Sequence, residues 1–126
     1  MSVLVTGGAG YIGSHMVYEL ADAGETVVVL DNLTTGFHWA VPGAAKLVVG
    51  DIGDEALVKQ IVAKHDVKAI IHFAGSIVVP ESVTDPLGYY LNNTVKSRAL
   101  IAAAVASGIK QFIFSSTAAV YGAPKV

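Results

Sequence analysis

The stretch VLVTGGAGYIGSH at residues 3–15 decides the fold of this chain. A short aliphatic run leads into three glycines with the spacing G-x-x-G-x-x-G, namely Gly7, Gly10 and Gly13, and a helical pattern follows until Gly24. A strand, a glycine turn and a helix N-terminus together form a place for a pyrophosphate, because backbone N–H groups and the helix dipole favour the anion. The glycine spacing alone is a weak signal, but in this context it predicts a dinucleotide-binding turn.

Composition narrows the class of protein. The 126 residues suffice for one domain with a sizeable core, and the formal net charge is −2 with no basic run. This balance argues against nucleic acid or an anionic membrane as the main partner. Cysteine is absent, which excludes a disulfide framework, a thiol nucleophile and a cysteine zinc cluster, and fits a cytoplasmic protein. No apolar run approaches the length of a membrane helix, and the start of the chain has no leader pattern, so no membrane partner is expected.

Apolar segments with the pattern of a strand alternate along the chain with segments that have the pattern of a helix. Strands are predicted at residues 3–6, 26–30, 46–49, 69–73 and 111–115, and helices at 11–23, 55–64 and 87–106. Strands that are apolar throughout and separated by helices predict a parallel sheet covered on both faces. Right-handed crossovers then give an α/β, doubly wound, Rossmann-type sheet of about five strands in the order 3-2-1-4-5, whose ligands bind beyond the carboxyl ends of the strands.

Two aspartates follow predicted strands at that edge. Asp31 ends the second strand, where a carboxylate accepts hydrogen bonds from the adenosine ribose and repels a 2′-phosphate. No positive side chain follows it before Lys46, which favours NAD over NADP. The alternative is a turn aspartate that accepts loop N–H groups. Asp51 follows the third strand in the same topological position, where the adenine would lie, while Asp54 is better read as a helix cap.

Other catalytic chemistries find less support. The four histidines, including His72 on an apolar strand, have no metal-ligand spacing, so no metal site is expected and His72 is predicted to be a packed core residue. Gly8 and Gly13 match half of a P-loop, but Ser14 and His15 stand where its lysine and hydroxyl residue should be, which excludes an NTPase.

Further segments along the chain complete a family pattern. They are DNL at 31–33, GDI at 50–52, HFAG at 72–75, PESV at 80–83, YYLNN at 89–93 and FSSTAAVYG at 114–122. With the glycine loop, and in this order, they resemble the extended short-chain dehydrogenase/reductase family, and within it the UDP-glucose 4-epimerases. The resemblance implies a bound NAD that serves as catalyst. In these enzymes a tyrosine takes the proton of the sugar 4-hydroxyl while C4 gives a hydride to NAD⁺. The transient 4-keto sugar then rotates in the site, and the hydride returns to its other face. The result is the interconversion of UDP-glucose and UDP-galactose.

The resemblance also assigns residues. It places Gly7, Gly10, Tyr11, Ile12 and Gly13 at the pyrophosphate, Asp31, Asn32, Thr35 and Gly36 around the ribose, Asp51 and Ile52 at the adenine, Phe73, Ala74 and Gly75 along the cofactor, Asn92 on the long helix, Ser115 near the nicotinamide, and Thr117 at the sugar 4-oxygen. Asn92 and Thr35 also fit a helix-capping and a turn-forming role. The family often has a lysine where Ile77 stands, which leaves that contact in doubt.

The catalytic Tyr-x-x-x-Lys pair of the family is not expected within these residues. Tyr121 and Lys125 match its spacing, but Gly122 and Pro124 oppose the helix that would bring the two onto one face. The segment around Tyr121 also matches a part of the family that precedes the true pair. We therefore expect residues 1–126 to be the NAD-binding domain of a longer enzyme, without the substrate domain, binding NAD but not epimerising the UDP-sugar.

The long helix predicts an interaction surface. Residues 99–106 are apolar nearly all round, and the whole chain is 53% hydrophobic with a mean hydropathy of +0.59. Such a helix needs cover on more than one side. In the family this helix contributes to a dimer interface, so a homodimer or self-association through residues 87–106 is expected.

Two rival hypotheses stay open. The first is a related nucleotide-sugar dehydratase or decarboxylase, although dehydratases generally have an acidic residue where Ala118 stands. The second is a non-catalytic NAD-binding module.

Overall fold

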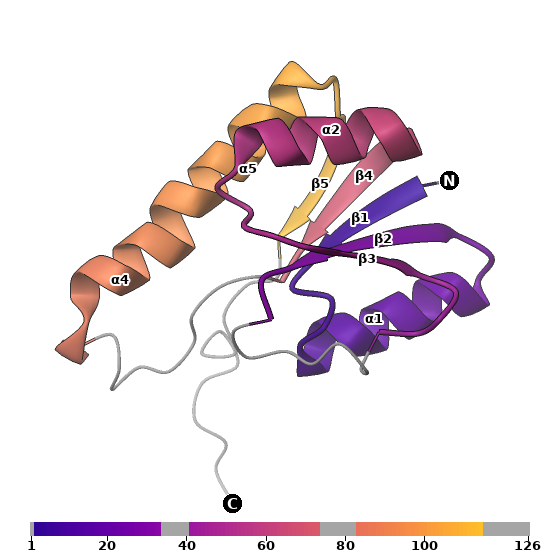
Figure 1. Cartoon of the computed structure of the whole chain (residues 1–126), viewed down its shortest axis with the longest axis horizontal. Helices are drawn as coiled ribbons and strands as arrows, with labels where there is room; N and C mark the ends of the chain where they lie inside the picture. The colour runs from indigo at the N-terminus through magenta and orange to yellow at the C-terminus, as the bar shows by residue number, and fades with distance from the viewer. Residues whose placement is uncertain (1, 34–40, 74–82, 115–126) are drawn as a thin grey trace, which may run out of the picture.

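The computed structural model describes residues 2–33, 41–73 and 83–114 (Figure 1). Its elements in chain order are β1 (Ser2–Thr6), α1 (Tyr11–Asp22), β2 (Thr26–Asp31), β3 (Lys46–Val49), α2 (Glu55–His65), β4 (Val67–His72), α4 (Pro86–Tyr90), the π-helical segment η2 (Leu91–Val95), α5 (Lys96–Ala106) and β5 (Gln111–Phe114).

The five strands form one parallel sheet in the order β3-β2-β1-β4-β5, which confirms the predicted fold class and strand order. β4 begins at Val67, two residues before the predicted start at residue 69. The reason is local: Asp66 ends α2 with a left-handed backbone, φ 51°, so the chain turns directly into the strand. Val67 then pairs with Ser2 of β1.

Helices cover both faces of the sheet, as Figure 1 shows, with α1 on one face and α2 and α5 on the other. Alternate residues of the strands point to opposite faces. One core cluster therefore joins Leu4 and Ile70 to residues of α2 and α5, and the second joins Val5 and Val29 to Val17 of α1. The continuous apolar runs of the strands reflect this two-sided burial.

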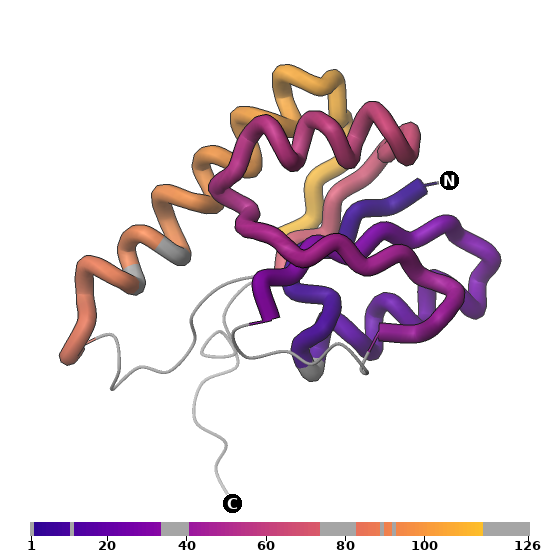
Figure 2. Tube along the Cα trace, in the orientation of Figure 1, coloured from indigo at the N-terminus to yellow at the C-terminus, as the bar shows by residue number. Residues whose placement is uncertain are grey.

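The long helix predicted at 87–106 is confirmed as an unbroken helical run from Pro86 to Ala106. Asp85 caps it by accepting a hydrogen bond from the Gly88 N–H at 3.1 Å. The π-helical segment in its middle has no counterpart in the sequence pattern. Figure 2 shows the first half of the helix running away from the sheet, while α5 packs against α2.

Apolar side chains remain exposed on this helix and on the neighbouring edge strand. They are Leu87, Tyr90, Leu91, Val95, Ile101 and Val105 on the helix, and Ile113 and Phe114 on β5. The high mean hydropathy thus has two sources, a doubly covered sheet and exposed apolar surface.

Candidate dinucleotide site

Main-chain hydrogen bonds gather the carboxyl ends of four strands at one edge. The Gly7 N–H donates to the Leu30 carbonyl at 3.0 Å, which joins the end of β1 to β2. The Phe73 N–H donates to the Thr6 carbonyl at 3.0 Å, and the Gly50 N–H donates to the Asp31 carbonyl at 3.1 Å. The glycine loop and the segments after β2, β3 and β4 therefore lie at the edge where a doubly wound sheet binds its ligand.

The glycine loop leaves the N-terminus of α1 open. Gly7 has a positive φ of 68°, and its carbonyl accepts the Gly10 N–H at 3.2 Å. Gly10 is the N-cap residue of α1 and provides no side-chain cap, and the first turn holds no acidic residue. In α2, by contrast, the Asp54 carboxylate accepts the Leu57 N–H at 3.1 Å. The N–H groups at the start of α1 are thus available to an external anion.

The three glycines of the motif differ in what requires them. A Cβ on Gly13 would lie 2.1 Å from the Gly7 carbonyl oxygen, so the close approach of helix to loop demands glycine there. Gly7 is required by its positive φ. Among the described residues, a Cβ on Gly10 would approach only the Gly7 oxygen, at 3.4 Å, and its φ of −78° suits any residue. Within the part of the chain that the structure describes, glycine is therefore not required at position 10.

Gly8 is a structural residue that the sequence analysis did not assign. A Cβ on Gly8 would lie 2.7 Å from Cγ1 of Val29 and 3.1 Å from Cγ2 of Val17. The first residues of the loop therefore press against β2 and α1 at once. In the sequence, the only local sign of this close packing is the pair of adjacent glycines at positions 7 and 8.

Asp31 connects two loops at the site. Its side chain is buried, with Oδ2 accepting the Ala9 N–H at 2.9 Å and Oδ1 accepting the Leu33 N–H at 2.8 Å. The bond to Ala9 fastens the glycine loop, and the bond to Leu33 holds a residue with a positive φ of 61°. A carboxylate offers about four acceptor positions, so these two bonds leave capacity for ribose hydroxyls. Both interpretations of Asp31, loop acceptor and ribose acceptor, are therefore compatible in one side chain.

Asp51 forms a compact polar cluster with a residue of the long helix. Its Oδ1 accepts the Gly53 N–H at 2.7 Å, and its Oδ2 accepts a hydrogen bond from Nζ of Lys96 at 2.7 Å. Burial raises the pKa of Asp51, but the hydrogen bonds from Lys96 and Gly53 and the charge of Lys96 outweigh it, so the pKa lies below its usual value. Lys96 was not among the predicted site residues, since no local pattern links it to a residue 45 positions earlier.

The remaining predicted residues differ in their surroundings. Asn32 directly follows β2 and is exposed. Ile12 is 62% exposed at the start of α1, whereas the side chain of Ile52 lies in the core, which leaves its main chain for a ligand. Tyr11 is the first residue of α1, and Asn92 lies in η2. Thr35, Gly36, Ala74, Gly75, Ser115 and Thr117 lie outside the described residues.

His72 is the packed core histidine that the sequence predicts. It is 1% exposed, with Nδ1 hydrogen-bonded to Oγ1 of Thr6 at 2.5 Å and Nε2 to Oγ of Ser97 at 2.9 Å. Burial lowers the pKa of His72 to about 4. The neutral ring thus joins β1, β4 and α5 directly beneath the carboxyl edge of the sheet.

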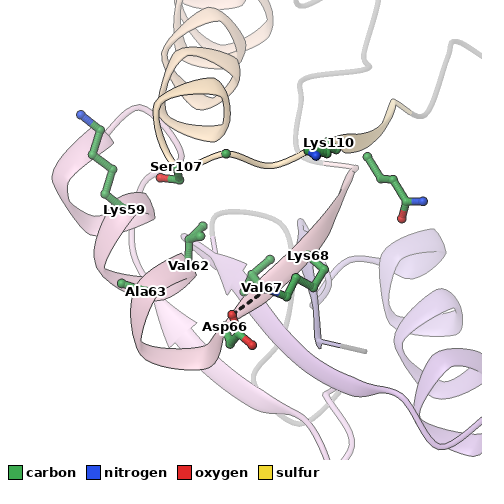
Figure 3. A pocket seen from close by; sticks show the side chains of 10 residues that line it. Lys59, Val62, Ala63, Asp66, Val67, Lys68, Ser107 and Lys110 are labelled. Atoms are coloured by element: carbon green, nitrogen blue, oxygen red, sulfur yellow. Dashed lines mark ion pairs between the residues drawn. The ribbon is translucent and has the colours of Figure 1, made fainter.

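A hollow among the described residues lies at the opposite edge of the sheet (Figure 3). Its volume is about 660 Å³, and Lys59, Lys68 and Lys110 are among its lining residues. The ends of α2 and α5 contribute Asp66 and Ser107 to it. Helix C-termini carry the negative end of the dipole and therefore disfavour an anion, whatever the volume of the hollow.

Among the described residues, no three histidine or acidic side chains gather in a way that could hold a metal ion. No helix in the same part of the chain is long and apolar enough to cross a membrane.

The strand order, the open glycine loop and Asp31 define an α/β domain of the dinucleotide-binding class. Residues 3–126 match the family described as "NAD dependent epimerase/dehydratase family", and the chain belongs to that family.

Relatives and solved structures place the similarity more closely. The chain is 56% identical over 98% of its length to a UDP-glucose 4-epimerase of Azospirillum brasilense, of which it spans 35%. The UDP-glucose 4-epimerase of Brucella ovis in complex with NAD has a TM-score of 0.91 at 45% identity, with 99% of this chain and 38% of that one covered. The enzyme of Bifidobacterium longum in complex with NAD⁺ and UDP has a TM-score of 0.88 at 38% identity, with 100% and 40% covered.

Proposed function

We propose that this chain is the NAD-binding part of a UDP-glucose 4-epimerase. The observation that carries the proposal is the glycine loop, where no described residue gives Gly10 a steric reason to be glycine and its φ gives no conformational one. A pyrophosphate lying on the open N-terminus of α1 supplies that reason. The epimerases of Brucella ovis and Bifidobacterium longum, both solved with NAD or NAD⁺, support the choice of cofactor.

Each part of the cofactor then has a partner in the chain. The proposed contacts are Gly7, Gly10, Tyr11, Ile12 and Gly13 for the pyrophosphate, Asp31, Asn32, Thr35 and Gly36 for the ribose, Asp51 and the main chain of Ile52 for the adenine, and Phe73, Ala74, Gly75, Asn92 and Ser115 along the rest of the cofactor. When bound, NAD supplies the acceptor and donor of the hydride at C4 of the sugar. Thr117 is proposed to hold the sugar 4-oxygen.

Charge supports NAD over NADP. The buried Asp31 carboxylate would repel the 2′-phosphate of NADP, because two like charges at close range in a partly buried site repel strongly. Lys96, a cation near the carboxyl edge, is engaged by Asp51. Lys46 begins β3 and so lies at the opposite edge of the sheet.

Titration calorimetry with NAD and NADP tests the cofactor proposal on the purified chain. We expect saturable binding of NAD and an affinity for NADP that is lower by at least about tenfold, since a tenfold ratio requires only about 1.4 kcal/mol of repulsion. The matched variant Asp31→Asn removes the charge and is expected to narrow that ratio. Absence of NAD binding, or equal affinities for the two cofactors in the unchanged chain, contradicts the proposal.

We further propose that the 126 residues alone do not epimerise UDP-sugars at a useful rate. The chain spans 35% of the length of the Azospirillum brasilense relative. A general base contributes about 10²–10⁴-fold to a rate, and loss of substrate positioning adds to that deficit. Incubation with UDP-galactose and NAD, followed by chromatography of the sugar nucleotides, checks this. Formation of UDP-glucose at ordinary enzyme rates contradicts it, and a dehydrated product would favour the dehydratase alternative.

The exposed apolar side chains of the long helix support self-association, most simply as a homodimer. Leu87, Leu91 and Val105 are 81%, 49% and 71% exposed, on a helical run of which the α5 part packs on α2. Sedimentation equilibrium at several concentrations is expected to give a mass above that of the monomer, and Leu91→Glu is expected to reduce it. A monodisperse monomer at the highest concentration rejects this part of the proposal.

A further inference from the structure

The ion pair between Asp51 and Lys96 joins the loop after β3 to the start of α5. Asp51 lies in the loop between β3 and α2, and Lys96 is the first residue of α5, directly after the π-helical segment. Nζ and Oδ2 are 2.7 Å apart, and the side chains of Lys96 and Asp51 are 23% and 45% exposed. The pair is therefore partly withdrawn from water, where a charge-assisted hydrogen bond is stronger than at an open surface.

Both oxygens of the Asp51 carboxylate are oriented by donors on the protein. Oδ1 accepts the Gly53 N–H and Oδ2 accepts the Lys96 ammonium, both at 2.7 Å. A Cβ on Gly53 would lie 3.1 Å from Cγ of Lys96 and 3.2 Å from Oδ1 of Asp51, so glycine lets the lysine stem lie close over the loop. These two hydrogen bonds fix the plane of the Asp51 carboxylate, so the directions in which its remaining lone pairs can accept a hydrogen bond are fixed as well.

The same pair borders a hollow of about 370 Å³. Leu91, Val95 and Ala99 of the helical run provide apolar walls, and Asp51 and Lys96 provide charged ones. Apolar walls with a few fixed polar groups suit a planar heterocycle that must be held in one orientation.

We propose that Lys96 is a positioning residue for adenine recognition. Lys96 fixes the orientation of the Asp51 carboxylate, so that a lone pair not used by Lys96 or Gly53 accepts a hydrogen bond from the exocyclic amino group of the adenine. This inference rests on the NAD site proposed above and extends it by a residue that acts through Asp51.

The test compares NAD with nicotinamide hypoxanthine dinucleotide, which has a carbonyl oxygen in place of the adenine amino group. A carboxylate accepts a hydrogen bond from the amino group but faces a lone pair on the carbonyl. Titration calorimetry of the unchanged chain is expected to give about tenfold tighter binding of NAD, as for a hydrogen bond to a charged group. The affinity ratio, rather than either affinity alone, is the readout, because a general loosening of the site weakens both dinucleotides alike.

Three variants separate positioning from structure. Lys96→Met removes the ammonium and keeps a similar stem, and it is expected to reduce the ratio to about twofold or less because the charged hydrogen bond that orients Asp51 is gone. Lys96→Arg keeps a cation and is expected to retain most of the ratio; it also serves if the methionine variant does not fold. Lys110→Met is the matched control, since it removes an equal charge beside the hollow at the opposite edge, and it should leave the ratio unchanged.

The outcomes are distinct. A ratio that collapses in Lys96→Met and persists in the arginine and control variants supports the proposal. Equal weakening of both dinucleotides, with the ratio intact, overturns it and leaves Lys96 a structural residue. A ratio near one in the unchanged chain also overturns it, while NAD binding itself would stand. Failure of the unchanged chain to bind NAD overturns this inference and the proposed function together.

Discussion

The two edges of the sheet differ in what they offer a ligand, although both are hollowed. At the carboxyl edge the open N-terminus of α1 meets the buried carboxylate of Asp31 and the glycine loop. At the amino edge the larger hollow, about 660 Å³, is lined by the ends of α2 and α5 and by three lysines. The helix ends there are C-termini, whose dipoles disfavour an anion. The direction of the helices, and not the size of the hollow, therefore identifies the edge that can hold a dinucleotide.

The largest effect is expected from Gly13→Ala at the carboxyl edge. The added Cβ would lie 2.1 Å from the carbonyl oxygen of Gly7, a backbone atom that cannot move without opening the loop. We expect a loss of at least about 3 kcal/mol in the free energy of unfolding, or no folding at all. Urea denaturation followed by circular dichroism measures it. A variant that unfolds at the same urea concentration as the unchanged chain would show that this close approach is absent in solution.

The next effect concerns pH. His72 has a folded pKa of about 4 against an ordinary value of 6.5, so the unfolded chain binds the proton more readily. The contribution of the neutral His72 ring to the free energy of unfolding is fully present above pH 6.5. It is lost as the pH falls towards 4, and the total loss is about 3 kcal/mol. Urea denaturation at a series of pH values should show stability rising across this window.

A pair of histidine variants assigns that pH dependence to one edge. His72→Gln should be less stable at pH 7 and should flatten the curve between pH 4 and 6.5, because the titrating group is gone. His65, at the amino edge, has a pKa lowered by burial and by Lys64 and Lys46 but is only half-buried, so His65→Gln should leave most of the slope. An unchanged slope in His72→Gln would reject the assignment.

Gly10→Ala should separate ligand binding from folding. Because its Cβ would meet only the Gly7 oxygen among the described residues, at 3.4 Å, we expect the free energy of unfolding to change by about 1 kcal/mol or less. The same methyl group lies where the pyrophosphate is proposed to approach, and NAD affinity should fall by at least about tenfold, or 1.4 kcal/mol. Calorimetric titration and urea denaturation of one preparation give both numbers. Undiminished NAD affinity would remove the main support for the proposed site.

The smallest effect is expected at the amino edge. Lys68 and Asp66 form an ion pair at 2.9 Å, with side chains 61% and 83% exposed. Exposed pairs contribute little, so Lys68→Met should change the free energy of unfolding by less than about 0.5 kcal/mol. Its NAD affinity should equal that of the unchanged chain. A marked loss of NAD affinity in this variant would mean that the ligand occupies the other edge.

The fold could be predicted because local patterns determine it. Apolar strands alternate with amphipathic helices, and the handedness of the crossovers leaves few strand orders. The placement of Asp31 and Asp51 followed from their positions after β2 and β3. The capping role of Asp54 followed from local geometry as well, and its carboxylate accepts the Leu57 N–H as expected.

The contacts that the sequence could not predict join residues far apart in the chain. Lys96 meets Asp51 across 45 positions, and His72 meets Thr6 across 66. Neither pair has a periodic or local signature, since each depends on the register of packed elements. The π-helical segment and the packing of Gly8 against Val29 belong to the same class, because each is set by how neighbouring elements fit together.

The central place of β1 has a consequence for how the protein is made. Ser2–Thr6 is synthesised before both of its partners, since it pairs with β2, from Thr26 onwards, and with β4, which ends at His72. The glycine loop can be anchored by Leu30 once β2 has been made, but the Phe73 bond to Thr6 can form only after β4 has been made as well. Vectorial synthesis therefore exposes the apolar flank of β1 until β4 arrives, and a pause in translation before that point would leave the nascent chain dependent on chaperones.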